Sequence, residues 1–342
     1  MITTQHMHNV LVVVLNWNGL DDTERCLVSL SKQTYSDFKI ALVDNGSKEP
    51  NTDERLGALA KKYGAKLHIL RNPNNLGFAG GVNTGITYAL EQEYEYVALF
   101  NNDAVAEPDW LMRLVEAAER EASAITTGLL LHADGTTIDS TGDWYSLWGL
   151  PFPRGRNLPT DAAQKSGPVF GGSGGATLYA TKLFREIGLF DETFFAYYED
   201  VDISFRAQLA GYTAYYEQSA VAYHKQGATS GTIPGFTVTQ TLKNLPLLYI
   251  KDVPGGLLIP VGLRFWPAYL LIAAKAILGP HTKAATTGLL QGIWLFWTHG
   301  VPSRFKIQRK NKVSSRHIRK LLWNDLPPDQ TGLRKLLRRP VQ

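Results

Sequence analysis

The sequence predicts an α/β fold in which helices flank a mixed, mostly parallel sheet, followed by a helical C-terminal region. From Val10 to about Ala98, short β-rich apolar runs alternate with helical stretches, which is typical of parallel sheets. Polar residues follow the predicted strands, and ligands of such sheets lie beyond the carboxyl ends of the strands. After about Gly231 the composition becomes apolar and then basic. These observations predict one ligand crevice and a distinct C-terminal part.

Four strands and three helices are expected in the first 103 residues. The first strand, Val10–Leu15, is an apolar run followed by Asn-Trp-Asn-Gly instead of a small-residue cleavage site, so we expect a buried strand and no signal peptide. The other elements follow in chain order: helix Asp21–Gln33, strand Lys39–Val43, helix Asp53–Tyr63, strand Lys66–Leu70, helix Gly81–Gln92 and strand Tyr96–Phe100.

Composition and charge limit the classes of protein that this chain can belong to. Its 342 residues, 44% of them hydrophobic and 11% aromatic, suffice for a sizeable core and exclude a disordered chain. The net charge of +4 conceals an asymmetry, because Arg304 to Gln342 holds twelve Lys/Arg and two Asp and the remainder carries −6. Cys26 is the only cysteine, which excludes an internal disulfide and a cysteine-based zinc site and fits a reducing cytoplasm.

Residues at the ends of the predicted strands are candidates for a nucleotide site. Asp44 could accept a hydrogen bond from a base or a ribose, although an Asx turn with Gly46 is an equal alternative. Asn72–Asn83 joins amides to glycines that allow close backbone approach, without the pattern of a P-loop or a dinucleotide fingerprint. The candidates for binding a nucleotide sugar are Asn16, Asn18, Asp44, Asn45, Asn72, Asn75, Gly77, Asn83, Asn101, Asn102 and Asp103.

Asp103 is the candidate anchor for a divalent metal ion. It follows a buried strand, and Mg²⁺ or Mn²⁺ typically takes one or two protein carboxylates, with phosphate oxygens and water completing its shell. A polar turn is the plain alternative. His224 ends a strand-like alternation and could add an imidazole ligand, although a lone histidine more often has an ordinary structural role.

Glu199 and Asp200, at the start of a predicted helix, are candidates for a catalytic base. Together with Asp202 they crowd three carboxylates into four positions beside tyrosines, and such crowding raises a pKa and strengthens a base. Capping of the helix is the alternative for part of this cluster. The small residues of Gly171–Gly175 would leave room for an acceptor sugar. The candidates for acceptor binding are Gly174, Gly175, Trp144 and Tyr198, although Trp144, with Tyr145 and Trp148, could equally form a satellite core.

Taken in order, these motifs resemble the inverting family 2 glycosyltransferases with a GT-A (Rossmann-like) fold, in particular the rhamnosyltransferase-like branch. The resemblance covers about Val10 to Ser230. It is carried by Leu15-Asn-Trp-Asn-Gly19, Val43-Asp-Asn-Gly-Ser47, Asn72 to Asn83, Leu99-Phe-Asn-Asn-Asp103, Gly188-Leu-Phe-Asp-Glu192 and Tyr198-Glu-Asp-Val-Asp202.

The resemblance implies a role for each part of the site. Asp44 would contact the nucleotide base, Asp103 would be the acid of the DxD-type motif, His224 would complete the metal site, and Asp200, with Glu199 beside it, would be the base. Asn101 stands at the first acid position of that motif, so a modest metal affinity is expected. The implied domains are a catalytic domain over 1–232, with a nucleotide-binding half over 1–103 and an acceptor-binding half over 104–232, and C-terminal helices with a basic tail over 233–342.

The C-terminal region predicts association with a membrane. Pro254–Gly279 and Ala284–Val301 are apolar but interrupted by polar residues, so each is marginal as a spanning helix. Their aromatic residues and the basic tail favour helices that lie in the interface of an anionic bilayer. The aromatic residues in question are Trp266, Tyr269, Trp294 and Trp297. A helical core and an integral hairpin are alternatives, and we expect no nucleic-acid partner because no such motif accompanies the tail.

The expected function is metal-dependent transfer of one sugar to a lipid-linked glycan in cell-surface polysaccharide synthesis, at the cytoplasmic face of a bacterial inner membrane. The resemblance favours L-rhamnose from dTDP-rhamnose. A UDP-hexose donor, a catalytically silent sugar-nucleotide-binding scaffold on the membrane and, from the paired carboxylates, a glycoside hydrolase are alternatives. The sequence contains no Gln-x-x-Arg-Trp, which argues against a processive polymer synthase.

Overall fold

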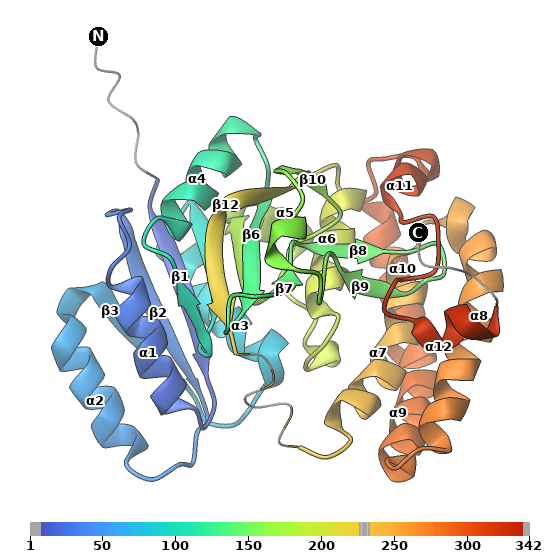
Figure 1. The fold of residues 1–342 in the computed structure, drawn as a ribbon, viewed down its shortest axis with the longest axis horizontal. Coiled ribbons are helices and arrows are strands. Elements are labelled where there is room, and N and C mark those ends of the chain that lie inside the picture. Colours follow the sequence, from blue (N-terminus) through green and yellow to red (C-terminus); the bar gives the residue numbers. More distant parts are fainter. Residues whose placement is uncertain (1–7, 226, 228–230, 232, 338–342) are drawn as a thin grey trace.

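The structure, a computed structural model, describes residues 8–225, 227, 231 and 233–337. A sheet with flanking helices occupies one part of the molecule, and the C-terminal helices gather at the end opposite α1 and α2 (Figure 1). The predicted domain boundary at residue 232 and the last two arginines of the basic tail lie outside the described residues.

The predicted nucleotide-binding half is a parallel sheet connected by helices, in the order β3-β2-β1-β4. The valines of β1 lie at its centre and are buried, as the apolar run predicts. The strands are β1 Val10–Asn16, β2 Phe38–Asn45, β3 Leu67–Asn72 and β4 Tyr96–Asn101, and the helices are α1 Leu20–Leu30, α2 Thr52–Tyr63 and α3 Gly77–Glu91.

Helix α3 begins at Gly77, four residues earlier than the expected start at Gly81. The glycines that suggested a turn lie inside the helix, where they permit close packing on the sheet. A Cβ added at Gly81 would lie 2.4 Å from the side chain of Leu15, and one at Gly85 would lie 2.5 Å from Val13. Small residues therefore bring the helix, and the residues at its start, close to the ends of the strands.

The second half extends the sheet with both parallel and antiparallel strands, which confirms the predicted mixed α/β fold. Strand β11 runs antiparallel between β4 and β6, and β12 pairs with β6 in parallel. This half contains β5 Ala104–Ala106, α4 Trp110–Arg120, β6 Ile125–His132, β7 Ile138–Ser140, the hairpin β8 Asp143–Tyr145 and β9 Pro151–Pro153, β10 Gly167–Val169, β11 Ala176–Ala180, α5 Thr181–Ile187, α6 Glu199–Leu209 and β12 Ala214–His224.

The C-terminal helices share a hydrophobic core with the sheet domain. Leu248 and Phe265 belong to the same buried cluster as Tyr145, Phe170 and Phe205, which come from the preceding half. The last part of the chain also packs there, since Trp323 hydrogen-bonds to the backbone beside β8. The elements are α7 Phe236–Asp252, α8 Gly255–Ile277, α9 Thr282–Leu295, the π-helical η5 Phe296–Gly300, α10 Val301–Arg309, α11 Ser315–Leu321 and α12 Thr331–Leu336.

One described helix, α8, is long and apolar enough to cross a bilayer, with a mean hydropathy of 1.7, although 39% of its apolar window is buried. Tyr269 on this helix is not an interfacial residue, contrary to expectation: it is 2% exposed, its ring stacks on Phe265, and its hydroxyl donates to Leu242 O. Trp294 and Trp297 are exposed, as an interfacial position requires.

Candidate active site

A cavity of about 340 Å³ opens at the carboxyl ends of β2 and β3, where the sequence predicts the nucleotide. Asp44, Ser47 and Arg71 contribute to its lining. The Asp44 side chain is almost fully buried; its Oδ1 accepts a hydrogen bond from Asn16 Nδ2 at 3.1 Å and its Oδ2 lies 3.8 Å from Arg71 Nε. Asp44 is therefore held in a fixed orientation at the edge of a hollow that could accept a base or a ribose.

The predicted asparagines near this cavity brace the loops around it. Asn16 Nδ2 and the Asn18 backbone N–H both donate to Ser47 Oγ, at 3.1 and 2.9 Å. Asn45 Nδ2 donates to Asn75 Oδ1 and to Gly77 O, both at 3.0 Å, and Asn45 Oδ1 accepts from Asn72 Nδ2 at 3.0 Å. These bonds fix the turn that leads into α3. Direct contact of their side chains with a nucleotide stays a prediction.

Two further candidates join separate parts of the fold. Asn83 exchanges hydrogen bonds with the backbone of Phe190 at 2.9 and 3.0 Å, which ties α3 to the segment preceding α6. Asn102 Nδ2 donates to Gly19 O at 3.3 Å and to Thr23 Oγ1 at 3.1 Å, which ties the end of β4 to the start of α1. Their predicted role with the nucleotide sugar is untested, and both have structural partners.

Asp103 and His224, the predicted metal ligands, lie in contact although 120 residues of chain separate them. His224 Nε2 is 3.0 Å from Asp103 Oδ1, and its Nδ1 is 2.7 Å from Asp139 Oδ2 on β7. Burial lowers the pKa of His224, but hydrogen bonds to the two carboxylates outweigh that effect and raise it to about 9. The pairing of β12 with β5 and β6 brings these residues together.

The residues present fit a divalent ion that also binds a substrate phosphate. Asp103 would supply a carboxylate ligand and His224 an imidazole nitrogen. Asp139 contacts the other ring nitrogen of His224, as carboxylates beside metal-bound histidines commonly do. The described residues contain no group of three or more His, Cys, Asp or Glu that could hold a metal ion by themselves. Mg²⁺ and Mn²⁺ take few protein ligands when substrate phosphates complete the shell.

A short chain of hydrogen bonds joins this pair to Asp200. Asn101 Nδ2 lies 3.2 Å from His224 Nε2, and the backbone N–H of Asn101 donates to Gly175 O at 2.9 Å. The preceding residue, Gly174, donates its N–H to Asp200 Oδ2 at 3.0 Å. The predicted acceptor glycines therefore lie between the candidate metal site and the candidate base.

The two acids at the start of α6 differ in their surroundings. Glu199 is 6% exposed, its Oε2 has no hydrogen-bond partner in the structure, and burial together with the neighbouring Asp200 raises its pKa well above the ordinary value. Asp200 is more exposed. Burial also raises its pKa, but hydrogen bonds from the N–H groups of Gly174 and Val201 partly offset the effect. Asp200 is thus the more accessible and the better stabilised carboxylate.

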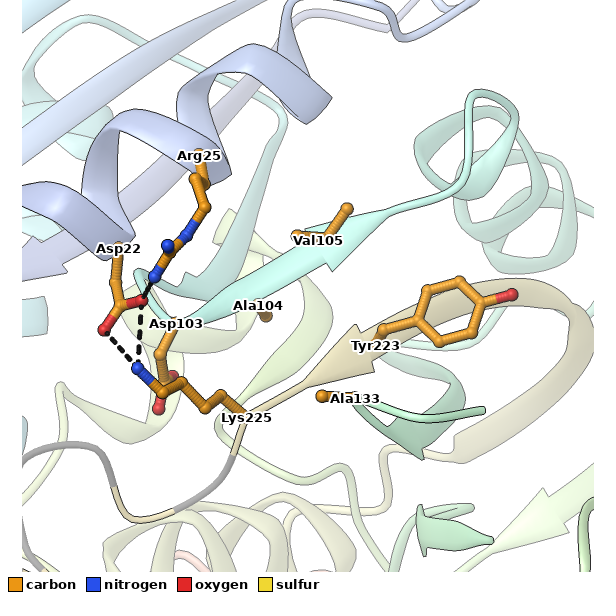
Figure 2. Close-up of a pocket in the computed structure, with 8 residues that line it drawn as sticks. All are labelled: Asp22, Arg25, Asp103, Ala104, Val105, Ala133, Tyr223 and Lys225. Carbon is orange, nitrogen blue, oxygen red and sulfur yellow. Dashed lines mark hydrogen bonds and ion pairs between the residues drawn. The ribbon is translucent and has the colours of Figure 1, made fainter. Parts of the chain in front are cut away.

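A second cavity, of about 470 Å³, lies beside Asp103 and carries two cations. Figure 2 shows Lys225 reaching from the end of β12 toward Asp22 on α1, with Arg25 on the other side of that carboxylate. Lys225 also donates its backbone N–H to Asp103 O at 3.0 Å. The lining of this cavity therefore combines two cations with the carboxylates of Asp22 and Asp103, next to the candidate metal site.

The other acceptor candidates belong largely to the core around the C-terminal helices. Trp144 is half-buried and its ring lies 6.1 Å from that of Trp323. Tyr198 is also half-buried, has a positive φ of 71°, and packs against the same cluster. The satellite-core alternative fits Trp144. For both residues, contact with an acceptor stays a prediction.

Sequence reasoning missed Asp139 and Arg156, which complete the centre of the site. Arg156 Nη2 donates to Asp139 Oδ1 at 2.7 Å, and its charge opposes the burial that raises the pKa of Asp200 and of the fully buried Asp143. Asp139 lies in Thr-Thr-Ile-Asp-Ser-Thr, which carries no recognisable motif. Only its pairing in the sheet, 85 positions before His224, brings it to the imidazole.

The chain is similar in sequence and in fold to known glycosyltransferases. The family model "Glycosyl transferase family 2" matches residues 11–188. A similar protein is the N-acetylglucosaminyl-diphospho-decaprenol L-rhamnosyltransferase of Mycobacterium tuberculosis, 28% identical over 246 residues, which cover 65% of this chain and 78% of that protein.

Two solved structures share the fold at 16% sequence identity and a TM-score of 0.56. One is a mannosyltransferase from Pyrobaculum calidifontis in complex with GDP-Man and Mn²⁺, and the match covers 93% of this chain and 88% of that one. The other is GalNAc-T7 with UDP, GalNAc and Mn²⁺, where the match covers 81% of this chain and 58% of the other. At this identity the likeness establishes the fold alone, which is the expected GT-A architecture.

Proposed function

The chain belongs to glycosyl transferase family 2, and from this we propose that it transfers one sugar from a nucleotide donor to a lipid-linked glycan, with inversion at the anomeric carbon. The protein is a glycosyltransferase, as its motifs predicted. The similarity to an L-rhamnosyltransferase whose name specifies a diphospho-decaprenol acceptor supports a dTDP-linked rhamnose donor and a polyprenyl-diphosphate acceptor. A UDP-linked hexose is the alternative donor.

The observation that carries the mechanism is the chain of contacts from His224 through Asn101 and the two glycines to Asp200. We assign Asp200 as the base that takes the proton of the acceptor hydroxyl, since it is the more accessible acid of the pair. The acceptor oxygen then attacks the anomeric carbon on the side opposite the leaving diphosphate. Burial and the neighbouring Asp200 raise the pKa of Glu199 well above its ordinary value, which makes it the less suitable base of the two acids.

Asp103 and His224 would hold a Mg²⁺ or Mn²⁺ ion, and the presence of Mn²⁺ in both structural neighbours supports this assignment. When bound, the ion neutralises the charge that develops on the departing diphosphate. The cavity lined by Asp44 and Arg71 would receive the nucleoside.

Exposed apolar side chains on the C-terminal helices support peripheral attachment to a membrane. On α9 and η5, large apolar residues follow helical spacing along one face, and α8 leaves a similar row uncovered. The exposed fraction of these residues ranges from 52% to 88%. The residues are Ile259, Leu263, Leu270, Leu278, Leu290, Ile293, Trp294, Trp297 and Phe305.

Cations accompany these apolar residues, as contact with an anionic bilayer requires. Arg264, Lys275 and Lys283 are exposed on the same helices. Part of the basic tail is committed elsewhere: Arg304 donates to the carbonyls of Ile250 and Val253, and the buried Arg334 pairs with Asp325. We place the enzyme at the cytoplasmic face of the inner membrane, where nucleotide sugars and polyprenyl-linked precursors of cell-surface polysaccharides meet.

A panel of sugar nucleotides tests this function. The purified protein is incubated with Mn²⁺, a synthetic polyprenyl-diphosphate GlcNAc acceptor and, in turn, dTDP-L-rhamnose, UDP-glucose and UDP-galactose, and products are identified by mass spectrometry. Transfer from one donor is expected. Asp200→Asn should abolish transfer while the donor still stabilises the protein against heat, and Asp103→Ala should weaken that Mn²⁺-dependent stabilisation.

The matched control is Asp161→Asn, which removes an exposed carboxylate away from these contacts and should retain wild-type turnover. Near-normal turnover of both Asp200→Asn and Asp103→Ala would contradict the assignment of the site. If wild type and variants bind the donor but none transfers the sugar to an acceptor of this class, the catalytically silent scaffold would be favoured instead.

A further inference from the structure

The loop that leads into the candidate base has an unusual backbone. Phe195, Tyr197 and Tyr198 have φ angles of 61°, 69° and 71°, in the left-handed region that residues with a side chain rarely adopt. Tyr198 directly precedes Glu199 and Asp200 at the start of α6. We call residues 194–198 the aromatic loop. Its conformation persists only if the surrounding structure holds it.

Helix α7 supplies that hold through two neighbouring buried side chains. Asn244, fully buried, shares the two N–H bonds of its carboxamide among the carbonyl oxygens of Phe194, Ala196 and Tyr197, at 3.0, 2.9 and 2.8 Å. Lys243, 7% exposed, donates from Nζ to Thr193 O at 3.2 Å and to Phe194 O at 3.1 Å. Nearly every carbonyl from 193 to 197 is therefore bonded to one turn of α7.

The other side of the aromatic loop contacts the donor half of the molecule. Phe195 O accepts from the N–H of Ala79 at 3.2 Å, and a Cβ added at Gly77 would lie 2.3 Å from that oxygen. The loop thus lies between the start of α3, beside the predicted nucleotide site, and α7. A displacement of the loop would move the carboxylates that follow it relative to the donor.

From these contacts we propose that Lys243 and Asn244 are positioning residues for the transfer reaction: they hold the aromatic loop so that Asp200 faces the acceptor hydroxyl. The inference rests on the proposed function. The position of Asp200 would then depend on the C-terminal helices, although these helices form neither the nucleotide cavity nor the candidate metal site. The charge of Lys243 also faces Glu199 and opposes the burial that raises the pKa of that acid.

The test compares Asn244→Asp with wild type. The substitution keeps the shape of the side chain but replaces its N–H donors with an oxygen that faces three carbonyl oxygens. Because a misplacement of about 1 Å can cost ~100-fold in rate, we expect kcat to fall by about 100-fold. The KM for the sugar nucleotide should stay within about threefold of wild type, since the nucleotide cavity is formed by other elements.

A second readout does not depend on activity. Chymotrypsin cleaves after Phe and Tyr, so release of the aromatic loop should expose new cleavage sites between residues 194 and 198, mapped by mass spectrometry under native conditions. Tyr249→Phe is the matched control, because it removes a hydrogen bond of 2.8 Å from the same helix, to Leu258 O, without touching the loop. It should leave kcat and the cleavage pattern unchanged.

If Asn244→Asp does not fold, Asn244→Ser, which keeps one donor, replaces it in both measurements. Wild-type kcat and an uncut loop in the folded variant would overturn the inference, as would an equal loss of kcat in Tyr249→Phe. Absence of transfer by the wild type would overturn the proposed function instead. The protease pattern would then decide on its own whether α7 holds the loop.

Discussion

Replacing Lys251 with methionine should destabilise the protein by about 3 kcal/mol, because it removes a buried cation from between two carboxylates. Lys251 Nζ contacts Asp191 and lies 2.6 Å from Asp202 Oδ1, and the lysine side chain is 1% exposed. Breaking a buried ion pair typically costs ~3–5 kcal/mol. The lower end applies here, since Asp202 keeps Arg206 at 2.8 Å and Asp191 keeps His299 at 2.8 Å.

Urea denaturation at pH 7.5 measures this loss as a decrease in the free energy of unfolding. Burial alone would raise the pKa of Asp191. The interactions with His299 and Lys251 lower it by more than burial raises it, so the net shift is downward. The stability contributed by a carboxylate with a lowered pKa is complete above its unfolded pKa of about 3.9 and is lost as the pH falls through its folded pKa. The difference between variant and wild type should therefore be smaller below about pH 4 than at pH 7.5.

The control is Lys312→Met, which removes an ion pair with Glu186 in which the lysine side chain is 63% exposed. Such surface pairs contribute ~0–1 kcal/mol. A loss of less than about 1 kcal/mol in Lys251→Met, or an equal loss in both variants, would refute the assignment of Lys251 as the central charge of this network.

Three further predictions concern the metal site, the glycines and the membrane. Asp139→Asn should weaken Mn²⁺ affinity ~10–100-fold in a calorimetric titration with nucleotide at pH 9.5, above the His224 pKa of about 9; Asp143→Asn, at a buried carboxyl whose pKa burial raises, should not. Gly77→Ala should lower the melting temperature, because Gly77 has a φ of 73° and the added Cβ would lie 2.3 Å from Phe195 O. Gly57→Ala should raise it slightly, because α2 is open at that position and alanine favours a helix over glycine. Substitution of Trp294 and Trp297 by Ser should reduce flotation with phosphatidylglycerol vesicles but leave turnover on a short-chain, water-soluble acceptor unchanged. Flotation equal to wild type would contradict membrane attachment through these exposed side chains.

The parallel half of the sheet could be predicted because local pattern determines it. Val10–Leu15 is apolar at every position, its first five residues are buried, and each strand ends at a polar residue. Glycine was the misleading signal. The same residues that usually mark a turn serve in α3 to bring a helix onto β1, and whether a glycine permits a turn or a close contact depends on a neighbour distant in sequence.

The candidate site was predictable where a motif marks it and not where only the fold creates it. Asp103 and Asp200 stand in recognisable motifs, whereas His224 was named only because the resemblance implies it. Hydrogen bonds and an ion pair connect the three residues, and their roles stay predictions. Asp139 and Asn244 have no motif of their own. Their importance arises from partners 85 and about 50 positions away, which no local pattern encodes. Tyr269 was misjudged for the same reason, because its burial depends on a partner on another helix.

Cys26 carries the only thiol of the chain, and its side chain is buried in the protein core. Cys26 is fully buried against Asn101 O, and burial raises its pKa far above the ordinary value, so maleimides and iodoacetamides should not modify it in the folded state. A cysteine introduced at position 297 or in the aromatic loop would then be the single labelling site in an otherwise unaltered background. Fluorophores or spin labels attached there could report bilayer contact and loop motion during turnover, without prior removal of a native residue.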